Sequence, residues 1–551
     1  MNAVNVVRQS LGDIVSSMSL SFPEKVTIEP PRDNKHGGDL AVNIAMILAK
    51  EAKMPPRALA EKISEKLQEL PFISLVDIAG PGFLNITLKP SFWQETLLNI
   101  ENSGKDFGSN VLDEKKKTQV EYVSANPTGP LHIGHGRGAA VGDSLARILR
   151  FAGHEVSTEY YINDAGNQMR LLGFSVWLRA CELKGLEVNW PESYYKGTYI
   201  IDIAKDILNK EPNLLEKEAT AAQDICYEYA MNEIMSGIKK DLADFKVSHD
   251  VWFSEKSLVD CGAIEAGFEA LKNSGLSYEK DNALWFATES LGDDKNRVLR
   301  KSDGSLTYFA SDIAYHHHKF GRGFNYLIDV WGADHHGYVP RMRAAITAMG
   351  RGQEEFDVVL IQLVNLLENG KPVSMSTRAG TFETLADVIA EVGVDAARFM
   401  FLSRKSDSSL DFDLELVKQR SMENPVYYVQ YAHARICALL RRSVDKGIEI
   451  PTVANIEDIE NLNHTDDLAL IQMATRFPQV VKQAAQNLGP HYISHYLSDF
   501  AANLHSYYAK HHILQESDLK LAKARLILLR NIASVFVIGL DLLGVSAPDS
   551  M

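Results

Sequence analysis

Two histidines three residues apart, His132 and His135, are the side chains in this sequence whose type and spacing most clearly offer chemistry. They lie in a Gly- and Pro-rich turn between a strand-like run at 119–124 and a helix-like run at 139–151. A helix N-terminus after a strand presents unpaired N–H groups and a favourable dipole to an anion. The turn therefore predicts a phosphate site with two imidazole donors, where Gly134 leaves room for a phosphate or a flat ring.

The turn differs from the common phosphate-binding loops. No Gly-Lys-Ser/Thr follows it, and its glycines are misplaced for a dinucleotide fingerprint. The stretch Ala-Asn-Pro-Thr-Gly-Pro-Leu-His-Ile-Gly-His-Gly-Arg, residues 125–137, instead resembles the HIGH signature of class I aminoacyl-tRNA synthetases in its arginyl-tRNA synthetase form. This resemblance implies ATP-dependent ligation of L-arginine to tRNA(Arg) through an arginyl-adenylate, with AMP and pyrophosphate as products.

The resemblance also assigns nucleotide contacts. His132 and His135 would be catalytic, and six residues would bind ATP: Gly134, Gly136, Asp334, His336, Met375 and Ser376. Asp334 and His336 follow a strand-like run at 326–331, and ligands of open α/β sheets bind at the carboxyl ends of strands. A strand-end cap is the alternative role for Asp334.

An arginine substrate sets a specific chemical demand, because its guanidinium carries five donors in a planar fork and favours carboxylates and an aromatic face. Asp312 lies four residues after Tyr308, so both would share one face of a helix. By resemblance, five residues contact arginine: Glu121, Ser124, Asn126, Tyr308 and Asp312. The alternatives are a helix-terminal charge for Asp312 and a core position for Tyr308.

A second loop departs from the family pattern. Synthetases of this class carry Lys-Met-Ser-Lys-Ser where this chain has Ser-Met-Ser-Thr-Arg at 374–378, so both lysines are missing. Lys371 and Arg378 are the remaining cations, and we expect them to be catalytic. Arg is a planar fork and Lys a point charge, so the exchange is not neutral. Mg²⁺ is expected with ATP, without a dedicated protein metal site.

Composition sets the broad class. A chain of 551 residues predicts more than one domain, and 45% hydrophobic with 23% charged residues is ordinary for a soluble protein. The four cysteines form no Cys-x-x-Cys pair, so neither a metal site nor a disulfide framework is predicted. The N-terminus does not resemble a signal peptide, and no apolar run suggests a membrane span. We expect a cytoplasmic monomer.

Three regions follow along the chain, and together they predict an α/β protein. Residues 1–115 read as an α/β module, with helices at 40–51 and 56–70 and two strands about a Gly-Pro-Gly turn at 76–88. Residues 116–415 predict a Rossmann-like parallel-sheet catalytic domain with a helix-rich insertion at about 170–295. Residues 416–551 predict an all-α bundle. By resemblance, the first region contacts tRNA and the last binds the anticodon.

Aromatic and cationic residues in the last region favour RNA contact. Net charge is −15, so an RNA surface must be local, and the last quarter of the chain carries none of this excess. Single-stranded RNA is recognised by aromatic and arginine planes. The expected tRNA contacts are Tyr427, Gln430, Arg435 and Tyr508, and a buried aromatic stripe is the alternative.

Two other functions compete with ligation. A small-substrate nucleotidyltransferase would share the HIGH-like fold, but it needs no helical RNA-binding region such as 416–551. A non-catalytic RNA-binding relative would be expected to lose the two histidines, which are present; only the altered loop at 374–378 favours it.

Overall fold

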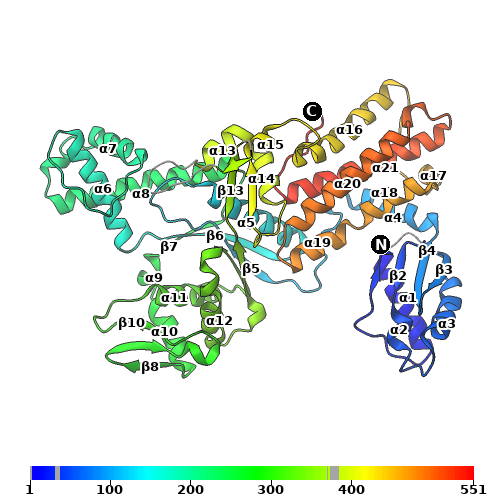
Figure 1. The fold of residues 1–551 in the computed structure, drawn as a ribbon, viewed down its shortest axis with the longest axis horizontal. Coiled ribbons are helices and arrows are strands. Elements are labelled where there is room, and N and C mark those ends of the chain that lie inside the picture. Colours follow the sequence, from blue (N-terminus) through cyan, green and yellow to red (C-terminus); the bar gives the residue numbers. More distant parts are fainter. Residues whose placement is uncertain (1–2, 32–36, 369, 373–383) are drawn as a thin grey trace.

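The computed structural model describes residues 3–31, 37–368, 370–372 and 384–551. Figure 1 shows an elongated molecule in which a central sheet separates a helical arm of residues 167–244 from the C-terminal helices. The N-terminal module forms a lobe beside those C-terminal helices. Within the described ranges, no helix combines the length and apolar character that crossing a bilayer requires.

The N-terminal module contains an antiparallel sheet ordered β1-β2-β4-β3. Its elements are α1 (Ala3–Ser17), β1 (Ile28–Glu29), β2 (Leu40–Val42), α2 (Ile44–Leu48), α3 (Pro56–Gln68), β3 (Ile73–Ala79), β4 (Phe83–Leu88) and α4 (Pro90–Ser103). The two strands predicted about the Gly-Pro-Gly turn are confirmed. The helix predicted at 40–51 was wrong at its start, because Leu40 and Val42 pair with β4 as a strand.

The parallel sheet predicted for the catalytic region is confirmed. Its order is β12-β11-β5-β6-β7, and all neighbouring strands are parallel. These strands are β5 (Lys117–Glu121), β6 (Glu155–Ile162), β7 (Val251–Ser254), β11 (Tyr326–Gly332) and β12 (Phe356–Ile361), with α5 (Ile133–Ala152) between the first two. Because the strands share one direction, the residues that follow β5, β7 and β11 meet at one edge of the sheet.

The segment 170–295 is more than the helix-rich insertion that the sequence predicted. After α6 (Asn167–Leu183), α7 (Thr198–Lys210) and α8 (Ala219–Asp244), the chain returns to the central sheet as β7. It then forms α9 (Ser257–Asp260), α10 (Ala263–Asn273) and an antiparallel sheet of β8 (Ser277–Lys280), β9 (Ala283–Phe286) and β10 (Arg297–Arg300), before α11 (Tyr308–Gly321). Four-residue strands are too short to show a clear alternation in sequence.

A third sheet, ordered β14-β13-β15, leads into the C-terminal helices. The elements are α12 (Val339–Ala348), β13 (Val364–Glu368), β14 (Lys371–Pro372), α13 (Leu385–Val392), α14 (Val394–Phe401), β15 (Leu410–Asp413), α15 (Leu414–Lys418), α16 (Pro425–Asp445), α17 (Ile456–Ile459), α18 (Thr465–Thr475), α19 (Phe477–Gln486), α20 (His491–Lys510) and α21 (Leu519–Leu542). The predicted all-α region is confirmed. It contacts the N-terminal module, where Gln472 Nε2 donates to Asp39 Oδ1 at 2.7 Å.

Candidate active site

The two histidines form the N-terminal cap of α5. His132 is the N-cap residue: its Nδ1 accepts the Gly134 N–H at 3.1 Å, and the His135 Nδ1 accepts the His132 N–H at 3.2 Å. The two rings stack with their centroids 3.7 Å apart. The helix therefore begins at Ile133, six residues before the predicted start. This cap explains how a segment containing three glycines enters a helix despite their low propensity.

These hydrogen bonds fix the chemical form of both rings. Since each Nδ1 accepts a hydrogen bond, each neutral imidazole carries its proton on Nε2 and can donate from there. Burial lowers the pKa of His132, and burial together with His132 lowers the pKa of His135 to about 3. Both side chains are partly exposed at the sheet edge. They therefore offer two neutral N–H donors near neutral pH, at the positive end of the α5 dipole.

A strained turn connects β5 to these histidines. Val123 and Ser124 have φ angles of 68° and 39°, which non-glycine residues rarely adopt and which cost about 1–3 kcal/mol each. Ser124 is held there because its Oγ donates to Glu121 Oε1 at 2.9 Å and accepts the Tyr161 N–H at 3.1 Å. Strain that the surroundings enforce is common at functional sites. Ser124, a predicted arginine contact, thus lies at a constrained position between β5 and β6.

The Glu121 carboxylate is already engaged by protein groups. Its Oε2 accepts from Lys319 Nζ at 2.6 Å, and Lys319 also donates to Asp329 Oδ1 at 3.0 Å. Glu121 is 8% exposed and Lys319 is fully buried. The sequence assigned Glu121 to arginine; the structure places it in a buried charge network instead, from which it supports Ser124.

Asp312 and Tyr308 occupy one side of α11, as predicted, but their surroundings differ. Tyr308 is 72% exposed, so the core alternative for it is wrong. Asp312 accepts a hydrogen bond from the Tyr338 hydroxyl, and burial raises the pKa of Asp312. A half-buried carboxylate with one oxygen directed by a hydroxyl is suited to pair with a cation.

Glu255 is a candidate site residue that the sequence interpretation missed. It follows β7 directly and lies near Asp312 and Asp164, and with its amide nitrogen facing Glu255, Asn163 donates to Glu255 Oε2 at 2.8 Å. Burial, then the charges of Asp312 and Asp164, raise the pKa of Glu255 to about 7. Its position after a strand of the parallel sheet was the available signal, but β7 itself was not recognised.

A pocket of about 410 Å³ opens beside this carboxylate group. It is lined by Ala165, Glu255, Lys256, Leu258, Val259, Asp260, Ile264, Leu306 and Ser311. Ser311 precedes Asp312 on α11, so the pocket connects β7 with α11. With the Glu255 carboxylate in its lining and Asp312 next to Ser311, this pocket is the strongest candidate for binding a guanidinium among the described residues.

The predicted nucleotide contacts are divided between open and buried positions. Asp334 and His336 lie on a 3₁₀ turn, Ala333–Tyr338, directly after β11, and both are exposed. Gly134 lies under the His132 ring, whose nearest atom would be 3.0 Å from an added Cβ. Gly136 is buried, and a Cβ there would approach Leu385 Cδ1 to 2.5 Å and Phe401 Cε2 to 3.3 Å. Close packing of α5 accounts for a glycine at position 136, and its assignment to ATP stays a prediction.

The chain that follows the second loop contacts the histidine turn. Lys371 is exposed on β14, and Thr384 forms an antiparallel bridge with His132 while the Leu385 N–H donates to the Leu131 carbonyl at 2.8 Å. Met375, Ser376 and Arg378 lie outside the described residues, as does the rest of 373–383. The chain that leaves this loop is therefore hydrogen-bonded to the entrance of α5.

The predicted tRNA contacts are also divided. Arg435 lies over the Tyr508 ring at 3.6 Å, and Tyr427 stacks on Tyr431 with centroids 6.1 Å apart. These side chains are partly exposed, and the Arg435–Tyr508 pair joins α16 to α20. Gln430 is buried, and its Nε2 donates to Asp395 Oδ2 at 3.0 Å and to the Ser546 carbonyl at 2.8 Å. Intramolecular partners use the Gln430 amide nitrogen, and its contact with tRNA stays a prediction.

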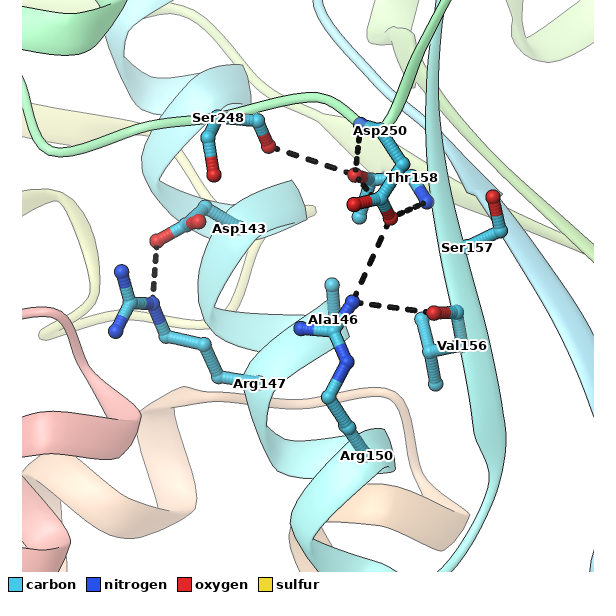
Figure 2. A pocket seen from close by; sticks show the side chains of 9 residues that line it. All are labelled: Asp143, Ala146, Arg147, Arg150, Val156, Ser157, Thr158, Ser248 and Asp250. Carbon is cyan, nitrogen blue, oxygen red and sulfur yellow. Dashed lines mark hydrogen bonds and ion pairs between the residues drawn. The ribbon is translucent and has the colours of Figure 1, made fainter.

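Another pocket, of about 600 Å³, lies between α5 and β6 (Figure 2). Its charged side chains are paired within the protein: Arg147 Nε donates to Asp143 Oδ2 at 2.8 Å, and Arg150 Nη2 lies 3.6 Å from Asp250 Oδ2. It is lined by the start of β6 and the later turns of α5, away from His132. This pairing leaves it a weaker candidate than the edge that carries the histidines.

Comparisons with known proteins agree across the whole chain. Family models match at residues 5–88 (arginyl tRNA synthetase N terminal domain), 97–435 (tRNA synthetases class I (R), catalytic domain) and 429–551 (DALR anticodon binding domain). The arginine–tRNA ligases of Desulfovibrio desulfuricans and Oleidesulfovibrio alaskensis are 61% and 60% identical, over 100% of each chain. The Thermus thermophilus arginyl-tRNA synthetase structure shares the fold, with a TM-score of 0.77 and 23% identity over 100% of both chains. By its domain composition and this identity, the chain belongs to the arginyl-tRNA synthetase family.

Proposed function

We propose that this protein ligates L-arginine to tRNA(Arg) in two steps, using ATP to form arginyl-adenylate and releasing pyrophosphate and then AMP. Family membership supports the reaction class, and one observation carries the assignment to this site. The Nε2–H donors of His132 and His135 follow β5 and the Glu255 carboxylate follows β7, at the same edge of one parallel sheet, and the Asp312 carboxylate on α11 lies near Glu255.

Adenylate formation places negative charge on the phosphate oxygens of ATP as the arginine carboxylate attacks the α-phosphate and pyrophosphate leaves. Donors already oriented toward that charge stabilise it without reorganisation. His132 and His135 are held by their Nδ1 hydrogen bonds, so their Nε2–H groups would donate to the phosphates. Asp334 and His336, exposed at the end of β11, would contact the adenosine side.

Selection of arginine follows from the carboxylate pair. Asp312 and Glu255 would bind the guanidinium, with the exposed ring of Tyr308 beside them. Lysine has a point charge in place of a planar fork and would satisfy one carboxylate better than two. Ser124 and Asn126, at the strained turn after β5, are proposed to contact the backbone end of the amino acid.

Mg²⁺ is proposed to enter with ATP. Among the described residues, the groups of three or more possible metal ligands both lie in the C-terminal helical region, away from His132. The acidic side chains near the histidines do not form such a group, so we assign no step to a protein-bound Mg²⁺. Lys371 and Arg378 are proposed as additional cations for the pyrophosphate.

The helical region after 416 is proposed to bind the anticodon through Tyr427, Arg435 and Tyr508, and the N-terminal module to contact tRNA as well. Arg435 and Tyr508 already stack on each other, so a base could extend that stack. A cytoplasmic monomer remains the proposed state.

The test is pyrophosphate exchange with each of the twenty amino acids, with and without tRNA(Arg), followed by aminoacylation. Among the twenty amino acids, we expect only arginine to support exchange and to be charged onto tRNA(Arg). Exchange with a different amino acid would overturn the arginine assignment, and exchange without any transfer to tRNA would favour the small-substrate nucleotidyltransferase.

A further inference from the structure

Three side chains with metal-binding atoms meet where the C-terminus lies against α16. His433 and Cys437 are one helical turn apart on α16, and Asp549 comes from the last three residues of the chain. Their ligand atoms all lie within 4.8 Å of one another. The sequence indicated no metal site here, because Asp549 is 112 residues from Cys437 and no short motif connects them.

The separations of these atoms match a tetrahedral ion. Cys437 Sγ lies 3.6 Å from His433 Nε2 and 3.6 Å from Asp549 Oδ1. A tetrahedral Zn²⁺, with bonds of about 2.3 Å to sulfur and about 2.0–2.1 Å to nitrogen or oxygen, places such ligand pairs about 3.5 Å apart. Ligands this close together need little movement to share one ion.

The imidazole is also oriented as a metal ligand. His433 Nδ1–H donates to the Pro548 carbonyl at 3.0 Å, which leaves the Nε2 lone pair facing Cys437. A ligand histidine commonly donates its other N–H to a carbonyl in this way. Arg441 Nη2 donates to the Asp549 carbonyl at 3.0 Å, and this bond holds the segment that supplies the third ligand.

A second group, His464, Asp466 and His511, is less suited to a cation. The His464 Nδ1 already accepts the Asp466 N–H at 3.1 Å, and Lys510 Nζ lies 3.5 Å from Asp466 Oδ1. That ammonium would repel an arriving metal ion, and the group contains no thiol. It serves as the comparison site in the experiment below.

We propose that His433, Cys437 and Asp549 bind one Zn²⁺ ion, with water as the fourth ligand. Thiolate and imidazole ligands in tetrahedral geometry select zinc over the harder Mg²⁺ and Ca²⁺. On binding, the Cys437 thiol proton leaves to solvent as the Zn–S bond forms. The ion would fasten the C-terminus to α16, beside the helix face proposed for tRNA.

The test uses the full-length protein, freed of metal by a chelator and titrated with Co²⁺ as a spectroscopic probe of zinc sites. We expect one equivalent of Co²⁺ to give a thiolate-to-cobalt charge-transfer band and visible absorption as intense as that of four-coordinate Co²⁺ sites. Zn²⁺ should displace the Co²⁺ and remove both features. Cys437→Ser should abolish the charge-transfer band. Asp549→Asn should weaken Co²⁺ binding at least about tenfold.

Two variants serve as matched controls. Cys261→Ser removes an exposed thiol elsewhere, and His464→Gln disables the comparison group, so both should keep the band. Zn²⁺ should raise the Tm of the wild type and of both controls, but not of Cys437→Ser or Asp549→Asn. A band that is absent from the wild type, or that persists in Cys437→Ser, would overturn the proposal. Since Asp549 is exposed, its variant tests the site even if Cys437→Ser folds poorly.

Discussion

Lys319 Nζ lies 2.6 Å from Glu121 Oε2, and this fully buried ammonium links the strand that leads to the histidine turn with β11, through Asp329 at 3.0 Å. Burial disfavours its charge, but the carboxylates of Asp329, Glu121 and Glu159 raise the pKa of Lys319 above its ordinary value. Lys319 therefore stays protonated and sets the position of Glu121, which in turn holds Ser124.

Replacing Lys319 with Met should destabilise the protein strongly. The change leaves Glu121 and Asp329 buried without their cation, and breaking a buried pair from one side costs about 3–5 kcal/mol. Urea unfolding gives the measurement. Lys405→Met is the matched control, because Lys405 pairs with Asp407 on the surface, where such pairs contribute about 0–1 kcal/mol. Equal losses of unfolding free energy in Lys319→Met and Lys405→Met would contradict the proposed role of the Lys319–Glu121–Asp329 charge network.

His132→Asn should separate capping from catalysis. Asparagine is among the best N-cap residues and can accept the Gly134 N–H, so stability should change little. The variant lacks the Nε2–H donor, and losing a donor to a developing oxyanion costs about 2.7–4 kcal/mol, or 10²–10³-fold in rate. Single-turnover adenylate formation measures this. His132→Ala should lose both cap and donor; a wild-type rate in His132→Asn would remove His132 from the chemistry.

Arginine binding should strengthen as pH rises through about 7. The raised pKa of Glu255, about 7, means that its carboxyl is neutral below this pH and ionised above it, while the arginine guanidinium stays charged throughout. If only the ionised form pairs with the guanidinium, affinity changes up to about tenfold per pH unit below 7. Glu255→Gln should bind arginine more weakly, and its affinity for arginine should not change with pH between pH 6 and 8. The exposed Glu279→Gln should keep the pH dependence.

Asp312→Asn should raise the KM for arginine and leave the KM for ATP nearly unchanged. A hydrogen bond to a charged group is worth about 1.5–3 kcal/mol, which corresponds to a change of about 10- to 150-fold. Tyr338→Phe is a milder companion, because it keeps the carboxylate and removes only the hydroxyl that orients it. If both KM values rise equally in Asp312→Asn, Asp312 does not belong to the arginine pocket.

Local signals predicted the histidine turn and the parallel sheet well, because both depend on residues close in sequence. Contacts between distant segments explain the misses. Glu255 went unrecognised because β7 has four residues and pairs with β6, about ninety positions earlier. Gln430 was assigned to tRNA because its neighbours are aromatic, whereas it is buried and bonded to Asp395 on α14 and to Ser546 in the segment after α21. The early start of α5 depends on the His132–His135 cap, which helix propensity cannot show.

Hydrogen bonds and helices connect the helical region to the histidine turn. Gln430 on α16 donates to Asp395 at the start of α14, and α14 follows α13 directly. Leu385, at the start of α13, donates to the Leu131 carbonyl beside His132. Because the second loop ends just before Leu385 in sequence, this path joins α16 to the histidine turn and to the chain that follows the loop.

Adenylate formation should therefore depend on bound tRNA. Both lysines of the family's second loop are replaced in this chain, so the free protein lacks two fixed cations that would face the departing pyrophosphate. A ligand shifts a conformation only by binding its two states differently, and tRNA on α16 would do so through the Gln430–Asp395 bond. Pyrophosphate exchange should be strong with intact tRNA, and also with tRNA whose terminal adenosine is oxidised, but nearly absent without tRNA.

Gln430→Leu should reduce the stimulation of exchange by tRNA and leave the KM for arginine unchanged. Lys371→Ala should reduce exchange with tRNA present if Lys371 supplies the missing charge, whereas full exchange would assign that charge to Arg378 or Mg²⁺. Robust exchange by the wild type without tRNA would refute the dependence.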